Sequence, residues 1–140
     1  VRLLEDQLHK EGSPWTVFNA SISGETSAGG LSRLPKLLEQ KKPKIVFLEL
    51  GANDALRGLS IDETEKNLRK MIQSSKKSGA KVLLFGMQIP PNYGQDYTKQ
   101  FRDLYPKLAR SEGIELLPKR VQVMPADVSV VKAYIATHCD

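Results

Sequence analysis

Two short apolar runs, separated by a segment with helical periodicity, constrain the fold of this chain most strongly. Ile45–Leu48 and Val82–Phe85 have the length and the β-branched or aromatic content of strands that are buried on both faces. Between and beyond these runs, apolar residues recur every three or four positions, as they do in amphipathic helices. Strands that alternate with helices of this length predict βαβ units, and therefore an α/β fold with a mainly parallel sheet.

Three segments are expected to form the helices of these units. A helix containing Leu31–Leu38 should stop before Pro43, because a residue that precedes proline disfavours helical backbone. Ser60 and Glu63 have the spacing of a capping box that begins the second helix. The apolar face of the second helix is formed by Ile61, Thr64, Leu68, Met71, Ile72 and Ser75, and Gly79 is its expected C-cap. The apolar face of the third helix is formed by Tyr97, Phe101, Leu104, Tyr105 and Leu108, and Gly113 is its expected C-cap.

Four strands are expected, at Trp15–Asn19, Lys44–Leu50, Lys81–Met87 and Ile114–Leu117. Parallel α/β sheets bind their ligands outside the carboxyl ends of the strands, so the loops that follow strands are the places to look for function. The three loops in that position are Ala20–Thr26, Gly51–Gly58 and Gln88–Gly94.

Composition and charge exclude several classes of protein. Hydrophobic residues make up 40% of the chain and charged residues 26%, which excludes a largely disordered or collagen-like chain. No apolar run approaches the roughly 20 residues that span a bilayer, so stable membrane insertion is not expected. The net charge of +5 comes from lysines that cluster where helices should end, without an aromatic ladder. These lysines favour solvated helix ends, and nucleic-acid binding is the less favoured alternative.

The cysteine and the two histidines indicate neither a metal site nor a redox site. The one cysteine, Cys139, excludes an internal disulfide and a cysteine-based zinc site. His9 is expected to be a solvated helix residue, and His138 lies near the chain end. No cluster has metal-ligand spacing, and we expect no cofactor.

The first two loops carry candidate groups for chemistry on a carbonyl. Asn53 follows the most apolar strand, and its side-chain amide is able to donate a hydrogen bond to a developing oxyanion. Asn53 and Asp54 are also residues that commonly form turns and helix caps after a strand. Gly24 offers a backbone N–H that no side chain obstructs, although its loop also reads as a plain turn. Ser21 and Ser23 are weak nucleophile candidates, because no histidine or aspartate neighbours them in sequence. The third loop, with two prolines and Tyr93, either lines an apolar cleft or forms a simple turn.

Taken together, the loops resemble those of the SGNH (GDSL) hydrolases, in particular the bacterial arylesterase, acyl-CoA thioesterase and lysophospholipase branch. The similarity covers residues 14–118, which is most of the chain. The segments that carry it are Asn19–Thr26, Arg33–Pro35, Glu49–Asp54 with Leu56–Gly58, Pro91–Gly94 and Tyr105–Ala109.

This resemblance implies a three-layer α/β/α, flavodoxin-like fold with a five-stranded parallel sheet. It also implies serine-dependent hydrolysis of small-molecule esters or thioesters, without a metal or organic cofactor. The signature glycine and asparagine of the family fall on Gly24 and Asn53, which in such enzymes hold the oxyanion together with the N–H of the nucleophile. The substrate loop of the family falls on Pro91, Asn92 and Tyr93. A periplasmic or secreted location is compatible with the family.

Two blocks of the family pattern are not found. The Gly-Asp-Ser-Leu block, which carries the nucleophile on the first strand, would precede Arg2–Lys10, where the sequence reads as the end of a helix. The Asp-x-x-His block should lie near the C-terminus, but Ala133–Asp140 has no aspartate three residues before His138. We hypothesise a frameshift after Pro118, which the nucleotide sequence would test.

We therefore expect residues 1–140 to form one partial domain without its first central strand. The chain should be inactive and poorly stable by itself, because a central strand leaves its backbone partners unpaired when it is absent. A cooperative thermal transition well above about 50 °C would contradict this expectation. The alternative from another class is a non-catalytic flavodoxin-like module that binds a small molecule or a partner. The acyl preference and the oligomeric state are open.

Overall fold

The computed structural model describes residues 6, 8–10, 12 and 15–118. The chain divides into two compact units, Val1–Ser23 with Val121–Asp140, and Gly24–Arg120. The hypothesised frameshift, His138 and Cys139 lie outside the described residues. The assignment of residues 1–140 to one partial domain stays a prediction.

In the first unit, the described part of Arg2–Lys10 is helical, as expected, and Leu8 is buried. His9 is exposed, also as expected. The strand expected at Trp15–Asn19 is wrong, because the structure assigns no regular element to residues 15–20. Aromatic and β-branched residues favour a strand, but this propensity depends strongly on the surrounding structure and does not by itself form one.

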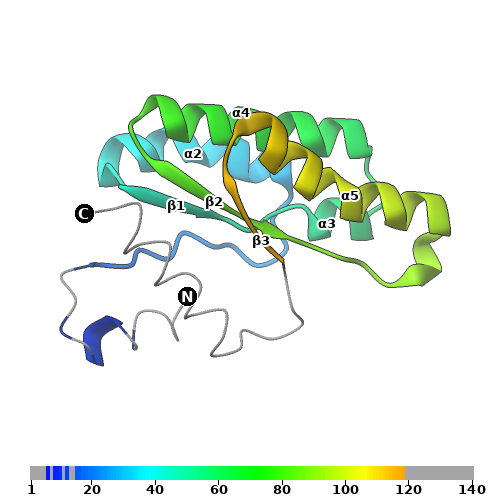
Figure 1. The fold of residues 1–140 in the computed structure, drawn as a ribbon, viewed down its shortest axis with the longest axis horizontal. Coiled ribbons are helices and arrows are strands. Elements are labelled where there is room, and N and C mark those ends of the chain that lie inside the picture. The colour runs from blue at the N-terminus through cyan, green and yellow to red at the C-terminus, as the bar shows by residue number, and fades with distance from the viewer. Residues whose placement is uncertain (1–5, 7, 11, 13–14, 119–140) are drawn as a thin grey trace. The chain divides into compact units, whose positions relative to one another are not determined.

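The second unit is built on a parallel sheet in the order β1-β2-β3, which confirms the predicted α/β class (Figure 1). Val46 of β1 lies opposite Val82 of β2, and Leu84 lies opposite Leu116 of β3. These three strands occur where the sequence predicted them, with ends that differ by at most two residues. Their bounds are Ile45–Leu48 for β1, Lys81–Gly86 for β2 and Glu115–Pro118 for β3.

Three long helices cover one face of this sheet: α2 (Ser27–Lys41), α4 (Ile61–Lys77) and α5 (Gln95–Glu112) (Figure 1). Helices α4 and α5 contact β2 and each other, and α2 contacts α4. The shared face follows from topology. The crossovers from β1 to β2 and from β2 to β3 step across the sheet in the same direction, and right-handed crossovers then place both helices on the same side.

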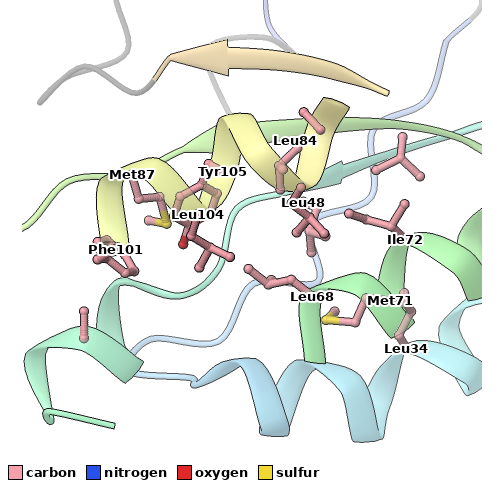
Figure 2. Packing of buried hydrophobic residues seen from close by; sticks show 14 of the residues in the cluster. Leu34, Leu48, Leu68, Met71, Ile72, Leu84, Met87, Phe101, Leu104 and Tyr105 are labelled. Carbon is pink, nitrogen blue, oxygen red and sulfur yellow. The ribbon is translucent and has the colours of Figure 1, made fainter. Parts of the chain in front are cut away.

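The core lies between this face and the helices (Figure 2). Leu48 and Leu84 of the sheet belong to one buried cluster with Leu68 and Ile72 of α4 and Phe101 of α5. The faces predicted for α4 and α5 are confirmed, with Ile61 and Tyr97 half-buried at their amino ends. The helix faces are therefore buried as the periodicity predicted, whereas Ile45, Val46 and Phe47 of β1, expected to be buried on both faces, are only half-buried.

The helix ends follow their local chemistry. Helix α2 stops before Pro43, as predicted. Ser60 caps α4, because its hydroxyl accepts the backbone N–H of Glu63 at 3.3 Å. At the other end of α4 the C-cap is Ser78 and not Gly79. Gly79 is the next residue, with a φ of 94°, because the helical backbone continues through Ser78 before the chain turns left-handed.

Two of the expected loops contain short helices, α3 (Ala52–Leu56) and the 3-10 helix η1 (Pro91–Tyr93). Gly51 joins β1 to α3 with a φ of 118°. A Cβ atom at Gly51 would lie 2.1 Å from the hydroxyl of Tyr105, so both backbone and packing require glycine. Across the described ranges, no helix has the length and apolar character needed to cross a bilayer.

Candidate functional site

Polar side chains gather where β1 ends and α3 begins, at the carboxyl edge of the sheet. Asn53 lies in the first turn of α3, and its amide nitrogen donates to the backbone carbonyl of Glu25 at 3.1 Å. Arg57, just after α3, donates to the carbonyl of Gly24 at 3.3 Å. The structure therefore brings the Asn53 amide to the loop that contains Gly24, although the two residues are far apart in sequence.

The bond to Glu25 uses one of the two N–H donors of the Asn53 amide. It fixes the plane of the amide and leaves the second N–H to donate elsewhere. Gly24 is exposed and has a φ of 78°, which L side chains rarely adopt. The described atoms around Gly24 leave open space, so the glycine is required by its backbone conformation and not by crowding.

An ion pair holds the side chain of Glu25. Arg33 of α2 donates from Nε to Oε2 of Glu25 at 2.8 Å and from Nη2 to Oε1 at 2.7 Å, so the guanidinium binds the carboxylate in a bidentate manner. The hydrogen bond to Glu25 raises the pKa of Arg33, against a smaller lowering by burial. The loop in front of α2 is thus tied to the second turn of α2 itself.

Asp54 is the buried polar centre of the site, with 4% of its surface exposed. Its Oδ1 accepts the backbone N–H of Ser27 at 2.7 Å, and its Oδ2 accepts the hydroxyls of Ser27 at 2.7 Å and Thr64 at 3.1 Å. The hydroxyl of Ser27 accepts the amide of Asn67 at 3.1 Å, so its single proton points to Asp54. Both oxygens of Asp54 therefore accept hydrogen bonds.

Two tyrosines near Asp54 have raised pKa values. Burial, and secondly the negative charge of Asp54, raise the pKa of Tyr105 well above its ordinary range. The same two causes raise the pKa of Tyr97. The hydroxyl of Tyr105 donates to the carbonyl of Leu50 at 2.6 Å, at the junction between β1 and α3. A protonated Tyr105 is needed for this bond.

The raised pKa of Tyr105 predicts a loss of stability at alkaline pH. Above about pH 10 a tyrosine in the unfolded chain loses its proton, whereas Tyr105 in the folded chain keeps it. The unfolded state then binds fewer protons, so the free energy of unfolding falls as pH rises, by up to about 1.4 kcal/mol per pH unit for one such group. Urea unfolding of wild type and Tyr105→Phe, followed from below to above this pH, should give a shallower alkaline slope for the variant. Equal slopes would contradict the prediction.

The other predicted site residues lie elsewhere in the described chain. Pro91, Asn92 and Tyr93 form η1, and all three are exposed. Ser21 and Ser23 are exposed residues of the first unit. The backbone N–H of Ser21 donates to the side-chain carbonyl of Asn19 at 3.0 Å, which is turn chemistry. Within the ranges that the structure describes, no three His, Cys, Asp or Glu side chains gather as ligands for a metal.

Several residues of this site were missed by sequence reasoning. The sequence predicts only a turn or cap role for Asp54, and it indicates no role for Ser27, Asn67 or the Glu25–Arg33 ion pair. One signal was present in the sequence, because Thr64 lies on the apolar face of α4, where a polar residue needs a buried partner.

Comparisons with protein families, curated proteins and solved structures agree on one family for this chain. The sequence model of the GDSL-like lipase/acylhydrolase family matches residues 1–133. Esterase TesA of Pseudomonas aeruginosa is 50% identical over 118 residues, which cover 84% of this chain and 59% of that protein. Thioesterase 1/protease 1/lysophospholipase L1 of Escherichia coli K12 is 47% identical over 116 residues, which cover 83% of this chain and 54% of that protein.

A solved structure with a similar fold is that of the psychrotrophic esterase EstA from Pseudoalteromonas sp., inhibited by monoethylphosphonate. It superposes with a TM-score of 0.82 and 41% identity, and covers 84% of this chain and 64% of that one. The chain thus spans a little over half the length of the curated relatives that it matches.

Proposed function

The chain belongs to the GDSL-like lipase/acylhydrolase family, and we propose that the protein hydrolyses carboxylic esters or acyl thioesters of small molecules through a serine nucleophile. Relatives that are about half identical to it carry the names of an esterase and a thioesterase. The observation in this chain that best supports the proposal is the amide of Asn53, held by the Glu25 carbonyl at the carboxyl end of β1.

In this proposal the Asn53 amide and the Gly24 backbone N–H form an oxyanion hole. The serine oxygen attacks the acyl carbon, and the former carbonyl oxygen takes the negative charge that these two groups stabilise. One preorganised donor of this kind contributes about 3–4 kcal/mol to the stability of the transition state. Its plane must be set before the substrate arrives, and the bond from Asn53 to Glu25 supplies that restraint.

The remaining steps follow from acyl transfer. On attack the serine gives its proton to a general base, and collapse of the tetrahedral intermediate then expels the alcohol or thiol, which takes up that proton, and leaves an acyl-serine. Water then attacks the acyl carbon and releases the carboxylic acid, which restores the serine. We assign neither the serine nor its general base to the described residues. Pro91, Asn92 and Tyr93 are the proposed substrate loop, and the exposure of all three leaves them accessible to a ligand.

The experiment is an assay of the protein expressed from its natural coding sequence. We expect turnover of p-nitrophenyl acetate or of a short acyl thioester, and loss of turnover after treatment with an alkyl phosphonate. Mass spectrometry of the treated protein should find the phosphonyl group on one serine. A label on Ser21, Ser23 or Ser27 would contradict the proposal, because it would place the nucleophile among the described residues. The absence of hydrolysis would favour the non-catalytic binding module.

A further inference from the structure

We infer that Asp54 is a positioning residue that sets the two oxyanion donors relative to each other through its bonds to Ser27 and Thr64. The inference rests on the proposed function, and it identifies the part of the structure that holds the donors in register. Asp54 is 4% exposed, so it acts through its neighbours and not on the substrate.

Both donors are connected to this carboxylate by short paths. Asn53 is the preceding residue on the same helical turn of α3. Gly24 lies three residues before Ser27, whose backbone N–H and hydroxyl both reach Asp54 at 2.7 Å. A shift of Asp54 would therefore move the amide of Asn53 and the start of α2 together.

The amino end of α2 requires a hydrogen-bond acceptor at a defined position. Ser27 is the first residue of α2, where backbone N–H groups have no partner within the helix and where the helix dipole favours a negative charge. The carboxylate accepts one of these N–H groups and the hydroxyl of the same residue, so it fixes both the position and the rotation of the amino end of α2. Asparagine at position 54 would replace one acceptor oxygen by a donor and reverse that part of the network.

Helix α4 supplies the rigid support. The hydroxyl of Thr64 lies 3.1 Å from both Oδ2 of Asp54 and the carbonyl of Ser60, so its single proton is shared between these two acceptors. Asn67, one turn further on, donates to the hydroxyl of Ser27 at 3.1 Å. Thr64 and Ser27 are almost completely buried. The described donors to Asp54 are all uncharged, so the carboxylate on α3 is held by directed hydrogen bonds from two other helices, α2 and α4, and not by a cation.

The test compares Asp54→Asn and Ser27→Ala with Ser75→Ala in the protein expressed from its natural coding sequence. Ser75 is the matched control, because its buried hydroxyl donates within α4 to the carbonyl of Met71 at 2.8 Å. We expect the first two variants to lower kcat about 10- to 100-fold with little change in KM, since small displacements of catalytic groups have effects of this size. Ser75→Ala should leave kcat unchanged.

Two further readouts separate positioning from stability. In ¹H–¹⁵N spectra, the backbone signal of Gly24 and the side-chain signals of Asn53 should shift in Asp54→Asn and Ser27→Ala, and should stay in place in Ser75→Ala. In an Asn53→Ala background, Asp54→Asn should cost clearly less in kcat than it does alone, because the group it positions is gone.

Folded variants with wild-type kcat and unshifted Gly24 and Asn53 signals would overturn the inference. If Asp54→Asn does not fold, Ser27→Ala decides by the same measurements, because it removes one contact and keeps the carboxylate. If the wild-type protein hydrolyses no ester or thioester, the proposed function fails, and the spectra still decide whether Asp54 positions the two groups.

Discussion

Asn53→Ala is expected to lower kcat about 10²- to 10³-fold, which is the usual cost of removing one oxyanion donor. The amide at position 53 stabilises charge that develops only in the transition state, so KM should change little. The variant also loses the bond to the Glu25 carbonyl, which is worth about 0.5–1.5 kcal/mol of stability. The measurement is steady-state hydrolysis of p-nitrophenyl acetate by the natural protein, with the free energy of unfolding determined in parallel.

Gln73→Ala is the matched control for this variant. Gln73 is an exposed amide on α4, and its truncation should leave kcat, KM and stability near their wild-type values. Wild-type kcat in a folded Asn53→Ala protein would remove Asn53 from the mechanism. An equal loss in Gln73→Ala would show that the assay reports a general effect of truncating amides.

Phe101→Ala is expected to destabilise the fold by about 3–5 kcal/mol, a typical cost of removing a buried aromatic side chain. Phe101 is fully buried on α5, and its ring lies edge-on to that of Tyr105 with 5.4 Å between the centroids. Figure 2 shows both rings in the core with Met87 and Leu104. The truncation leaves a cavity and removes this aromatic contact. Urea unfolding should show a lower midpoint with an unchanged slope.

Tyr93→Ala is the control for this second prediction. Tyr93 is an aromatic residue of η1 that is 37% exposed, so its truncation should change stability by less than about 0.5 kcal/mol. A Phe101→Ala protein as stable as Tyr93→Ala would mean that Phe101 is not part of the cooperative core.

Most of the second unit could be predicted because its elements are long and amphipathic. Helices α4 and α5 bury the faces that periodicity selected, and Leu48 and Leu84 occupy the sheet positions that the apolar runs indicated. Helix α3 was missed because its five residues are too few to show a period. Trp15–Asn19 was wrongly expected to be a strand, because strand propensity does not specify a partner.

The candidate site was predictable only in part, for a similar reason. Asn53 and Gly24 stood out as polar or flexible residues after expected strands, and the resemblance to a known family singled out the same two. Asp54 and Ser27 are 27 positions apart, and their bond exists only because the amino end of α2 meets α3 in the folded unit. Contacts of this range depend on tertiary packing, which neither periodicity nor capping rules contain.

The measurement that tests the central claim most directly is a crystal structure of the natural protein after reaction with an alkyl phosphonate. The phosphonyl oxygen stands in for the oxyanion of the tetrahedral intermediate. We predict that it lies about 2.7–3.1 Å from both the amide nitrogen of Asn53 and the backbone nitrogen of Gly24. A phosphonyl oxygen held by other donors, with Asn53 and Gly24 both out of hydrogen-bond range, would contradict the account.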